Sequence, residues 1–223
     1  MLTEPGGPPA EGPLSRGRIV AAAIDLIERE GADAISMRRV AAGLGVGVMS
    51  LYNHVPSKDA LLDAVAEAVL SEIEFTDDPG VHWTDRVRAQ ARAFRQIAHD
   101  HPRSTMLVVS RQLHTTAGLL PVERALATLR SAGFDGADAV RMLRMFIAFI
   151  VGSLLREVGV TPAFAPVHGG PVTVGEVDAV LFPEVSALAG LLGQCDHEAE
   201  FAFGVELLLR AMEVHPGRRQ GTR

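Results

Sequence analysis

The chain has 223 residues, of which 48% are hydrophobic and 22% charged, and its formal net charge is −6. This composition is typical of a globular protein and excludes a chain that is disordered or fibrous as a whole. The longest uncharged apolar run has eleven residues, at 145–155, and is too short for the roughly 20 residues that a membrane-spanning helix needs.

The N-terminal residues lack the basic start and the apolar stretch of a secretory signal, and they are rich in Gly and Pro. We therefore expect residues 1–14 to form a disordered tail. The single cysteine, Cys195, permits no internal disulfide and fits a cytoplasmic location. Residues 14–58 hold six basic and four acidic residues, whereas the rest of the chain is net acidic. A basic module on an acidic body is typical of a DNA-binding protein with a regulatory domain.

Apolar residues recur at helical spacing along most of the chain, which predicts an all-α fold. Ser15, Ser36 and Ser57 each precede an apolar-periodic segment and suit the N-cap position of a helix. The predicted helices cover, in chain order, about 15–31, 36–43, 47–54, 57–75, 83–100, 103–113, 119–132, 136–158, 183–192 and 198–213.

Breaks in this helical pattern divide the chain. We predict a first unit over residues 15–76, which includes a linker helix, and a second helical unit over 77–214, followed by a disordered tail at 215–223. The segment 159–175 holds several Pro and Gly residues and is too long for a tight connection, so we expect it to be mobile or functional.

The segment 37–56 is typical of a helix-turn-helix, in which two short helices cross closely. Ala41 is small enough for the crossing, Gly45 can adopt the positive φ of the turn, and Leu51 anchors the second helix. The second helix then presents hydrogen-bonding and methyl-bearing side chains and no acidic ones, which suits a phosphate-lined groove. These outward side chains are Val48, Met49, Ser50, Tyr52, Asn53 and His54. An ordinary buried helical hairpin is the alternative.

This segment resembles the DNA-binding domain of the tetracycline-repressor family. The resemblance rests on Gly45-Val46, Leu51-Tyr52, His54 and Lys58-x-x-Leu61-Leu62. It implies a dimeric, all-helical transcription regulator that binds a double-stranded DNA operator and a small-molecule effector. By position it implies that Arg38 and Ser50 contact DNA, that Val48 and Met49 touch base edges, that Tyr52 and His54 bind phosphates, and that Lys58 reaches the backbone. Ser36 completes the predicted DNA-binding set. Asn53 departs from the Trp of the tetracycline repressors, so their base preference does not carry over.

The second unit resembles the C-terminal domain of the same repressors, through Trp83-x-Asp85, Ala91-x-x-Phe94, Gly133-Phe134, Gly152 and Phe203-Gly204-x-Glu206-Leu207. Phe94 matches a residue that lines their drug pocket, and Gln90 stands where they use an Asn. The predicted ligand-binding residues are Gln90, Phe94, Val108, Arg111, Met145 and Phe149. They predict a largely apolar effector.

The metal ligands of those repressors are not retained. Val108 stands at the position of their metal-binding His, and Arg111 stands at the position of the neighbouring Thr. Arg156 stands at the position of the acidic residue that completes their metal shell. A magnesium chelate needs oxygen ligands or imidazole, and the arginines would repel the ion. We therefore expect no metal site and no response to magnesium-tetracycline. Whether Arg111 and Arg156 face the pocket is open at this point.

Two alternatives remain. The chain could be an enzyme or a sequestering protein that binds a small apolar ligand, although no catalytic dyad or cofactor motif supports it. It could also bind DNA as an activator or a nucleoid-type protein. In the preferred interpretation the protein is a homodimeric repressor, and helices 136–158 and 198–213 of each chain form a four-helix dimer interface.

Overall fold

The computed structural model describes residues 12–74, 78, 80–111, 115–157, 178–192 and 194–215, and within them the predicted all-α fold is confirmed. The helices are α1 (Arg16–Glu30), the 3-10 helix η1 (Ala32–Ala34), α2 (Met37–Gly43), α3 (Val48–Tyr52), α4 (Lys58–Ser71), α5 (Trp83–Asp100), α6 (Thr105–Ser110), α7 (Thr116–Ser131), α8 (Gly136–Glu157), α9 (Pro183–Leu192) and α10 (His197–Glu213). Among the described helices, none is both long and apolar enough to cross a membrane.

The three serine caps lie where the sequence predicts them. The side chains of Ser15, Ser36 and Ser57 each accept a hydrogen bond from the backbone N–H three residues further on, at 3.0–3.3 Å. Each bond satisfies an N–H group that has no partner within its own helix. Short-range chemistry therefore determines where α1, α2 and α4 begin.

Several helix ends differ from the prediction. Helix α4 ends at Ser71 and not near residue 75, because Ile73 turns inward and packs beside Ile97 of α5. Helix α6 is shorter than predicted, since the chain becomes extended at Arg111. Helix α7 begins three residues earlier than predicted, at Thr116, after a cap by Thr115.

Some predicted segments lie outside the described residues. They are residues 1–11 of the N-terminal tail, 216–223 of the C-terminal tail, and the segment 159–175.

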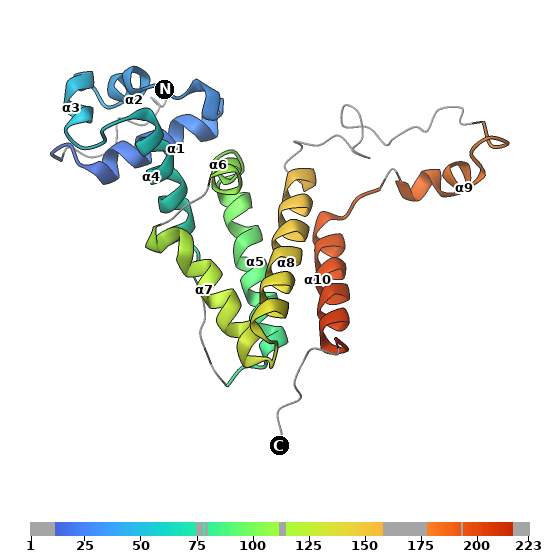
Figure 1. Cartoon of the computed structure of the whole chain (residues 1–223). Helices are drawn as coiled ribbons and strands as arrows, with labels where there is room; N and C mark the ends of the chain where they lie inside the picture. The colour runs from blue at the N-terminus through green and yellow to red at the C-terminus, as the bar shows by residue number, and fades with distance from the viewer. Residues whose placement is uncertain are drawn as a thin grey trace, which may run out of the picture.

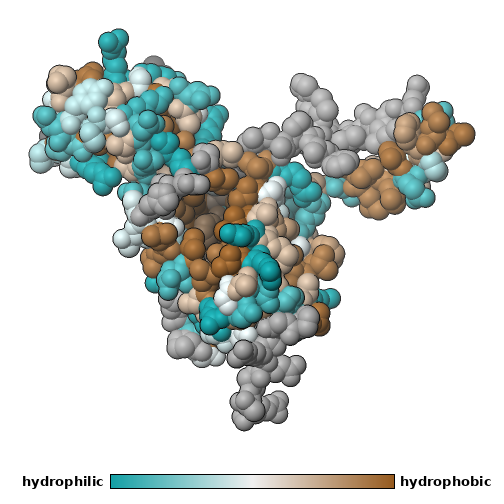
Figure 2. Space-filling view, viewed as in Figure 1, coloured by the Kyte–Doolittle hydropathy of each residue, from teal (hydrophilic) through white to brown (hydrophobic). Residues whose placement is uncertain are grey.

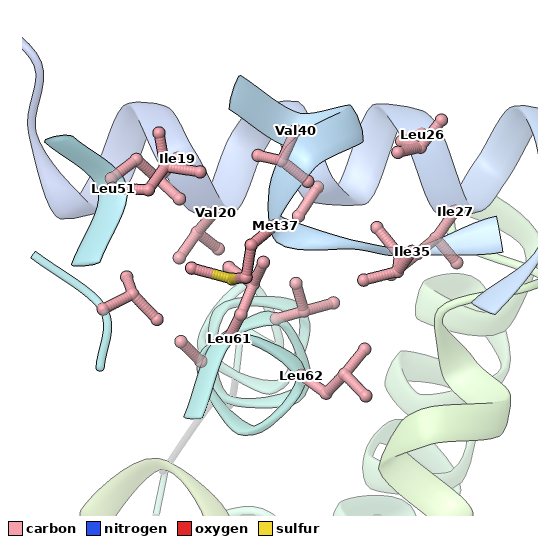
Figure 3. Packing of buried hydrophobic residues seen from close by; sticks show 14 of the residues in the cluster. Ile19, Val20, Leu26, Ile27, Ile35, Met37, Val40, Leu51, Leu61 and Leu62 are labelled. Atoms are coloured by element: carbon pink, nitrogen blue, oxygen red, sulfur yellow. The ribbon is translucent and has the colours of Figure 1, made fainter. Parts of the chain in front are cut away.

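Helices α1 to α3 surround the first half of α4 and form one end of the molecule (Figure 1). Their shared core contains Ile19 of α1, Val40 of α2, Leu51 of α3 and Leu61 of α4, each at most 1% exposed. Figure 3 shows these side chains converging between the helices. The core extends to Leu107 of α6, so the first unit is packed against the second.

Helices α5, α7, α8 and α10 form the second body, which α4 enters from above in Figure 1. Its core includes Trp83, Phe134, Phe146, Phe201 and Leu209. Helix α9 stands away from this body (Figure 1), and it has no buried residue. This arrangement leaves space between α5, α7 and α8 and an exposed apolar surface on α9.

Candidate functional site

The turn between α2 and α3 has the geometry of a helix-turn-helix. Gly45 adopts φ of 66°, a left-handed conformation that favours glycine. The N–H of Val46 donates to the carbonyl of Ala41 at 3.0 Å and closes the turn. Leu51 is 0% exposed and fixes α3 to the core. These contacts determine which face of α3 points to solvent.

The exposed face of α3 and the residues that follow it carry most of the predicted DNA-binding side chains. Met49 is 75% exposed and Tyr52 is 42% exposed. Asn53 and His54 follow on the surface, Lys58 is exposed at the start of α4, and Ser50 is half-buried. No carboxylate lies on α3, which suits an approach to a polyanion.

The predicted DNA-binding residues on α2, in its cap and at the start of α3 differ in how accessible they are. Arg38 is exposed and makes no ion pair among the described residues, whereas its neighbour Arg39 donates to both carboxylate oxygens of Glu30 at 2.6–2.7 Å. The side chain of Ser36 is engaged as the cap of α2. Val48 is half-buried against the core, so only part of its side chain can reach a ligand.

A pocket opens between α5, α7 and α8. Figure 2 shows it as a hydrophobic hollow in the second body. It encloses about 600 Å³ of empty space, which includes part of the solvent at its mouth. Among the described residues, its walls are apolar apart from one side chain, Gln90. The described lining residues are Val87, Gln90, Ala91, Phe94, Pro121, Val122, Ala125, Leu129, Leu143, Phe146, Ile147 and Ile150.

The amide of Gln90 has a defined orientation. The hydroxyl of Thr128 donates to the carbonyl of Arg124 at 2.9 Å, so its oxygen is left to accept a hydrogen bond. The Nε2 amide of Gln90 donates to this oxygen at 3.1 Å. The carbonyl oxygen Oε1 of Gln90 is therefore the end of the amide that stays available, and it has no hydrogen-bond partner among the described residues.

The pocket includes Gln90 and Phe94, as predicted, but not the predicted residues of α6 and its end. Val108 packs on α4 and α5 beside Val69 and Ile97. The guanidinium of Arg111 donates to Asp63 at 2.7 Å and to Asp59 at 3.2 Å, both on α4. Two carboxylates thus hold Arg111 against α4, so its predicted place in the pocket lining is wrong, whereas its binding of a ligand stays a prediction.

The two predicted residues of α8 also lie outside the pocket lining. Residues 143, 146, 147 and 150 share one helical face and line the pocket, whereas Met145 and Phe149 lie on the neighbouring face. Phe149 contacts Phe201 of α10 with ring centroids 5.7 Å apart, and Met145 is 37% exposed. The apolar wall from α7 was missed, because its sequence differs little from that of an ordinary core helix.

Arg156 pairs with Glu200 of α10 and does not line the pocket. Nearby, Arg95 of α5 donates to Glu157 at the end of α8 at 2.6 Å. Burial raises the pKa of Glu157, but the hydrogen bond and charge of Arg95 outweigh it and hold the pKa below its ordinary value. These pairs join α5, α8 and α10. Within the described part of the chain, no group of three His, Cys, Asp or Glu side chains could hold a metal ion.

Two family models match the chain. One describes bacterial regulatory proteins of the tetR family and covers residues 19–65. The other describes a tetracyclin repressor-like C-terminal domain and covers residues 76–215. The matches correspond to the helix-turn-helix unit and to the body that holds the pocket.

Individual proteins are similar over nearly the whole chain. The tetracycline repressor protein class A from transposon 1721 of Escherichia coli is 31% identical, with 88% of this chain and 89% of that protein covered. The transcriptional repressor DrrR1 of Streptomyces coeruleorubidus is 29% identical, with 99% and 86% covered. Among solved structures, ActR of Streptomyces coelicolor in complex with actinorhodin superposes with a TM-score of 0.75 at 29% identity, with 91% and 98% covered.

Proposed function

Because the chain belongs to the TetR family of bacterial transcriptional regulators, we propose that it is a homodimeric repressor that binds a palindromic operator and leaves it when a small, largely apolar molecule occupies the pocket. The observation that carries this proposal is the combination, in one chain, of an exposed acid-free face on α3 and an apolar pocket in the adjoining body. The similarity to ActR, a protein crystallised with actinorhodin, supports the ligand response.

The exposed residues of the helix-turn-helix have separate proposed roles. Tyr52, His54 and Lys58 bind phosphates and so contribute equally on every DNA sequence. The sequence preference is set by the side chains that face base edges. These are Arg38, Met49, Ser50, Asn53 and the exposed part of Val48. Ser36, through its cap, positions α2 against the backbone. In a dimer the two α3 helices would read half-sites about 34–36 Å apart.

The salt dependence of binding tests the phosphate contacts. Lys58→Ala is expected to weaken binding to specific and random duplexes alike and to lower the slope of log affinity against log salt by about 1, because one fewer counterion is released. The measurement is fluorescence anisotropy at several salt concentrations, with a duplex selected from a random pool. Arg92→Ala is the matched control, since it removes one exposed positive charge from α5. Equal slopes for the two variants would contradict the assignment.

Exposed apolar side chains support the homodimer. On α10, Phe203 and Leu207 lie one turn apart and are 70% and 57% exposed. Leu181, just before α9, and Leu191 within it are 69% and 68% exposed. A monomer seldom leaves this many large apolar side chains so exposed to water. A second copy of the chain is the proposed occupant of these surfaces, with α8 and α10 of each chain in the interface.

The orientation of Gln90 narrows the class of effector. An apolar molecule that carries a hydroxyl or N–H donor would satisfy Oε1 of Gln90, whereas one that carries only acceptors would leave this oxygen unpaired on burial. We therefore propose that the effector is an apolar, ring-containing molecule with a hydrogen-bond donor. Magnesium-tetracycline fits less well, because the described pocket lining carries no carboxylate or imidazole that could ligate a metal.

A matched pair of probes tests the role of Gln90. We expect 2-naphthol, a donor, to bind about 2- to 12-fold more tightly than 2-methoxynaphthalene, which corresponds to one net hydrogen bond. Gln90→Leu should remove this preference. Gln96→Leu should keep it, because Gln96 lies on the same helix but is exposed and bonded to Asp100. Isothermal titration calorimetry measures all six affinities, those of two probes for three proteins. If the unmodified protein binds both probes equally, the donor requirement is wrong.

A further inference from the structure

A second connection between the two parts of the molecule lies beside the covalent link through α4. It joins the end of α1 to the turn that precedes α6. One carboxylate oxygen of Glu28 accepts the backbone N–H of Ser104 at 2.8 Å, and the other accepts that of Arg103 at 3.2 Å. In return, the guanidinium of Arg103 donates to the backbone carbonyl of Arg29. We call these four residues the α1–α6 joint.

The joint is a reciprocal cap. The last carbonyls of α1 and the first N–H groups around α6 have no partners within their own helices. Glu28 accepts hydrogen bonds from N–H groups around α6, and Arg103 donates a hydrogen bond to one of the last carbonyls of α1. Each of these hydrogen bonds includes a charged group, which makes it stronger than a bond between neutral groups. Ser104 is 0% exposed, so breaking the joint would leave its N–H buried without a partner.

The joint is linked to the pocket through the last part of α5. Phe94 lines the pocket on α5, and α5 ends at Asp100, immediately before the turn that carries Arg103 and Ser104. The same turn contacts the end of α4, because Nε2 of His101 lies 2.9 Å from a carboxylate oxygen of Glu72. A displacement of the last turns of α5 would therefore move the groups that hold α1.

We propose that Glu28 is a positioning residue that fixes the orientation of the helix-turn-helix unit relative to the pocket body. It acts through the backbone of Arg103 and Ser104, and it is independent of the ion pairs that join Arg111 to α4. The role goes beyond the proposed function, because it concerns how the two parts of one chain are held and requires neither a particular effector nor a dimer.

The test measures the distance between the two parts within one chain. Spin labels are placed at Ala42→Cys on α2 and Ala127→Cys on α7, both exposed positions, in a Cys195→Ser background diluted with unlabelled protein. Double electron–electron resonance should give one narrow distance distribution. Glu28→Ala should broaden it, and Glu28→Gln, which keeps one carbonyl acceptor, should give an intermediate width. Asp25→Ala is the matched control, since it removes an exposed carboxylate from the same helix.

Two further readouts separate positioning from a general loss of stability. Amide hydrogen exchange at Arg103 and Ser104 should accelerate in Glu28→Ala but not in Asp25→Ala. Affinity for the selected duplex should fall about five- to tenfold in Glu28→Ala, the lower part of the range typical of coupling between sites. If Glu28→Ala and Asp25→Ala give the same distance distribution, the proposal is overturned. The proposed repressor function would be untouched by that result, because it is tested by DNA and ligand binding of the unmodified protein.

Discussion

Leu51→Ala is expected to lower the free energy of unfolding of the helix-turn-helix unit by about 2–5 kcal/mol, the usual effect of removing a fully buried leucine side chain. Leu51 is 0% exposed and lies in the core with Ile19 and Val40 (Figure 3). Helix α3 has five residues, too few to be stable by itself. Its position therefore depends on this side chain, and specific DNA binding should be lost together with the stability.

Met49→Ala is the matched control. Met49 lies two residues before Leu51 on the same helix but is 75% exposed, so its removal should change stability by less than about 0.5 kcal/mol. Urea denaturation followed by circular dichroism measures both variants. If Leu51→Ala unfolds at the same urea concentration as Met49→Ala, then Leu51 does not anchor α3, and the assignment of the exposed face of α3 is wrong.

Local chemistry explains why the first part of the chain could be predicted well. The caps at Ser15, Ser36 and Ser57 depend on residues three positions away, and the turn at Gly45 depends on a conformation that glycine adopts easily. These signals lie within a few neighbouring residues. The ends of helices are less predictable, because α4 ends where Ile73 finds a distant partner, Ile97.

The pocket could be predicted only in part, since long-range partners decide which helical face lines it. Gln90 and Phe94 lie in its lining. Arg111 was assigned to the pocket by resemblance, but Asp59 and Asp63 of α4 attract it elsewhere. On α8, neither the stripe of apolar residues nor its period distinguishes the face toward the pocket from the face toward α10. The α1–α6 joint was missed because its partners lie 74–76 positions apart in the chain.

The packing of α8 on α10 leads to the last prediction. Gly204 of α10 faces the ring of Phe149 so closely that a Cβ at this position would overlap the ring. The ring has little freedom to move away, because Phe201 lies on it with centroids 5.7 Å apart. Overfilling a packed contact of this kind costs about 1–3 kcal/mol. Gly204→Ala should therefore destabilise the second body or force α10 away from α8.

Gly152→Ala provides the comparison, because Gly152 lies within α8 and, among the described residues beyond its own helix backbone, no atom would meet its added Cβ within 4 Å. Replacing glycine by alanine inside a helix stabilises it by roughly 0.5–1 kcal/mol, so Gly152→Ala should raise the melting temperature. Gly204→Ala has the same gain in helix propensity, and the difference of about 1–3 kcal/mol between the two variants isolates the clash with Phe149.

A double variant tests the clash directly. In Gly204→Ala with Phe149→Leu, the smaller side chain should recover part of this difference, which a double-mutant cycle measures as a coupling between the two sites. Equal stabilisation by Gly204→Ala and Gly152→Ala would mean that α8 and α10 are not in close contact at this point. The proposed dimer interface, which is built on these two helices, would then need a different geometry.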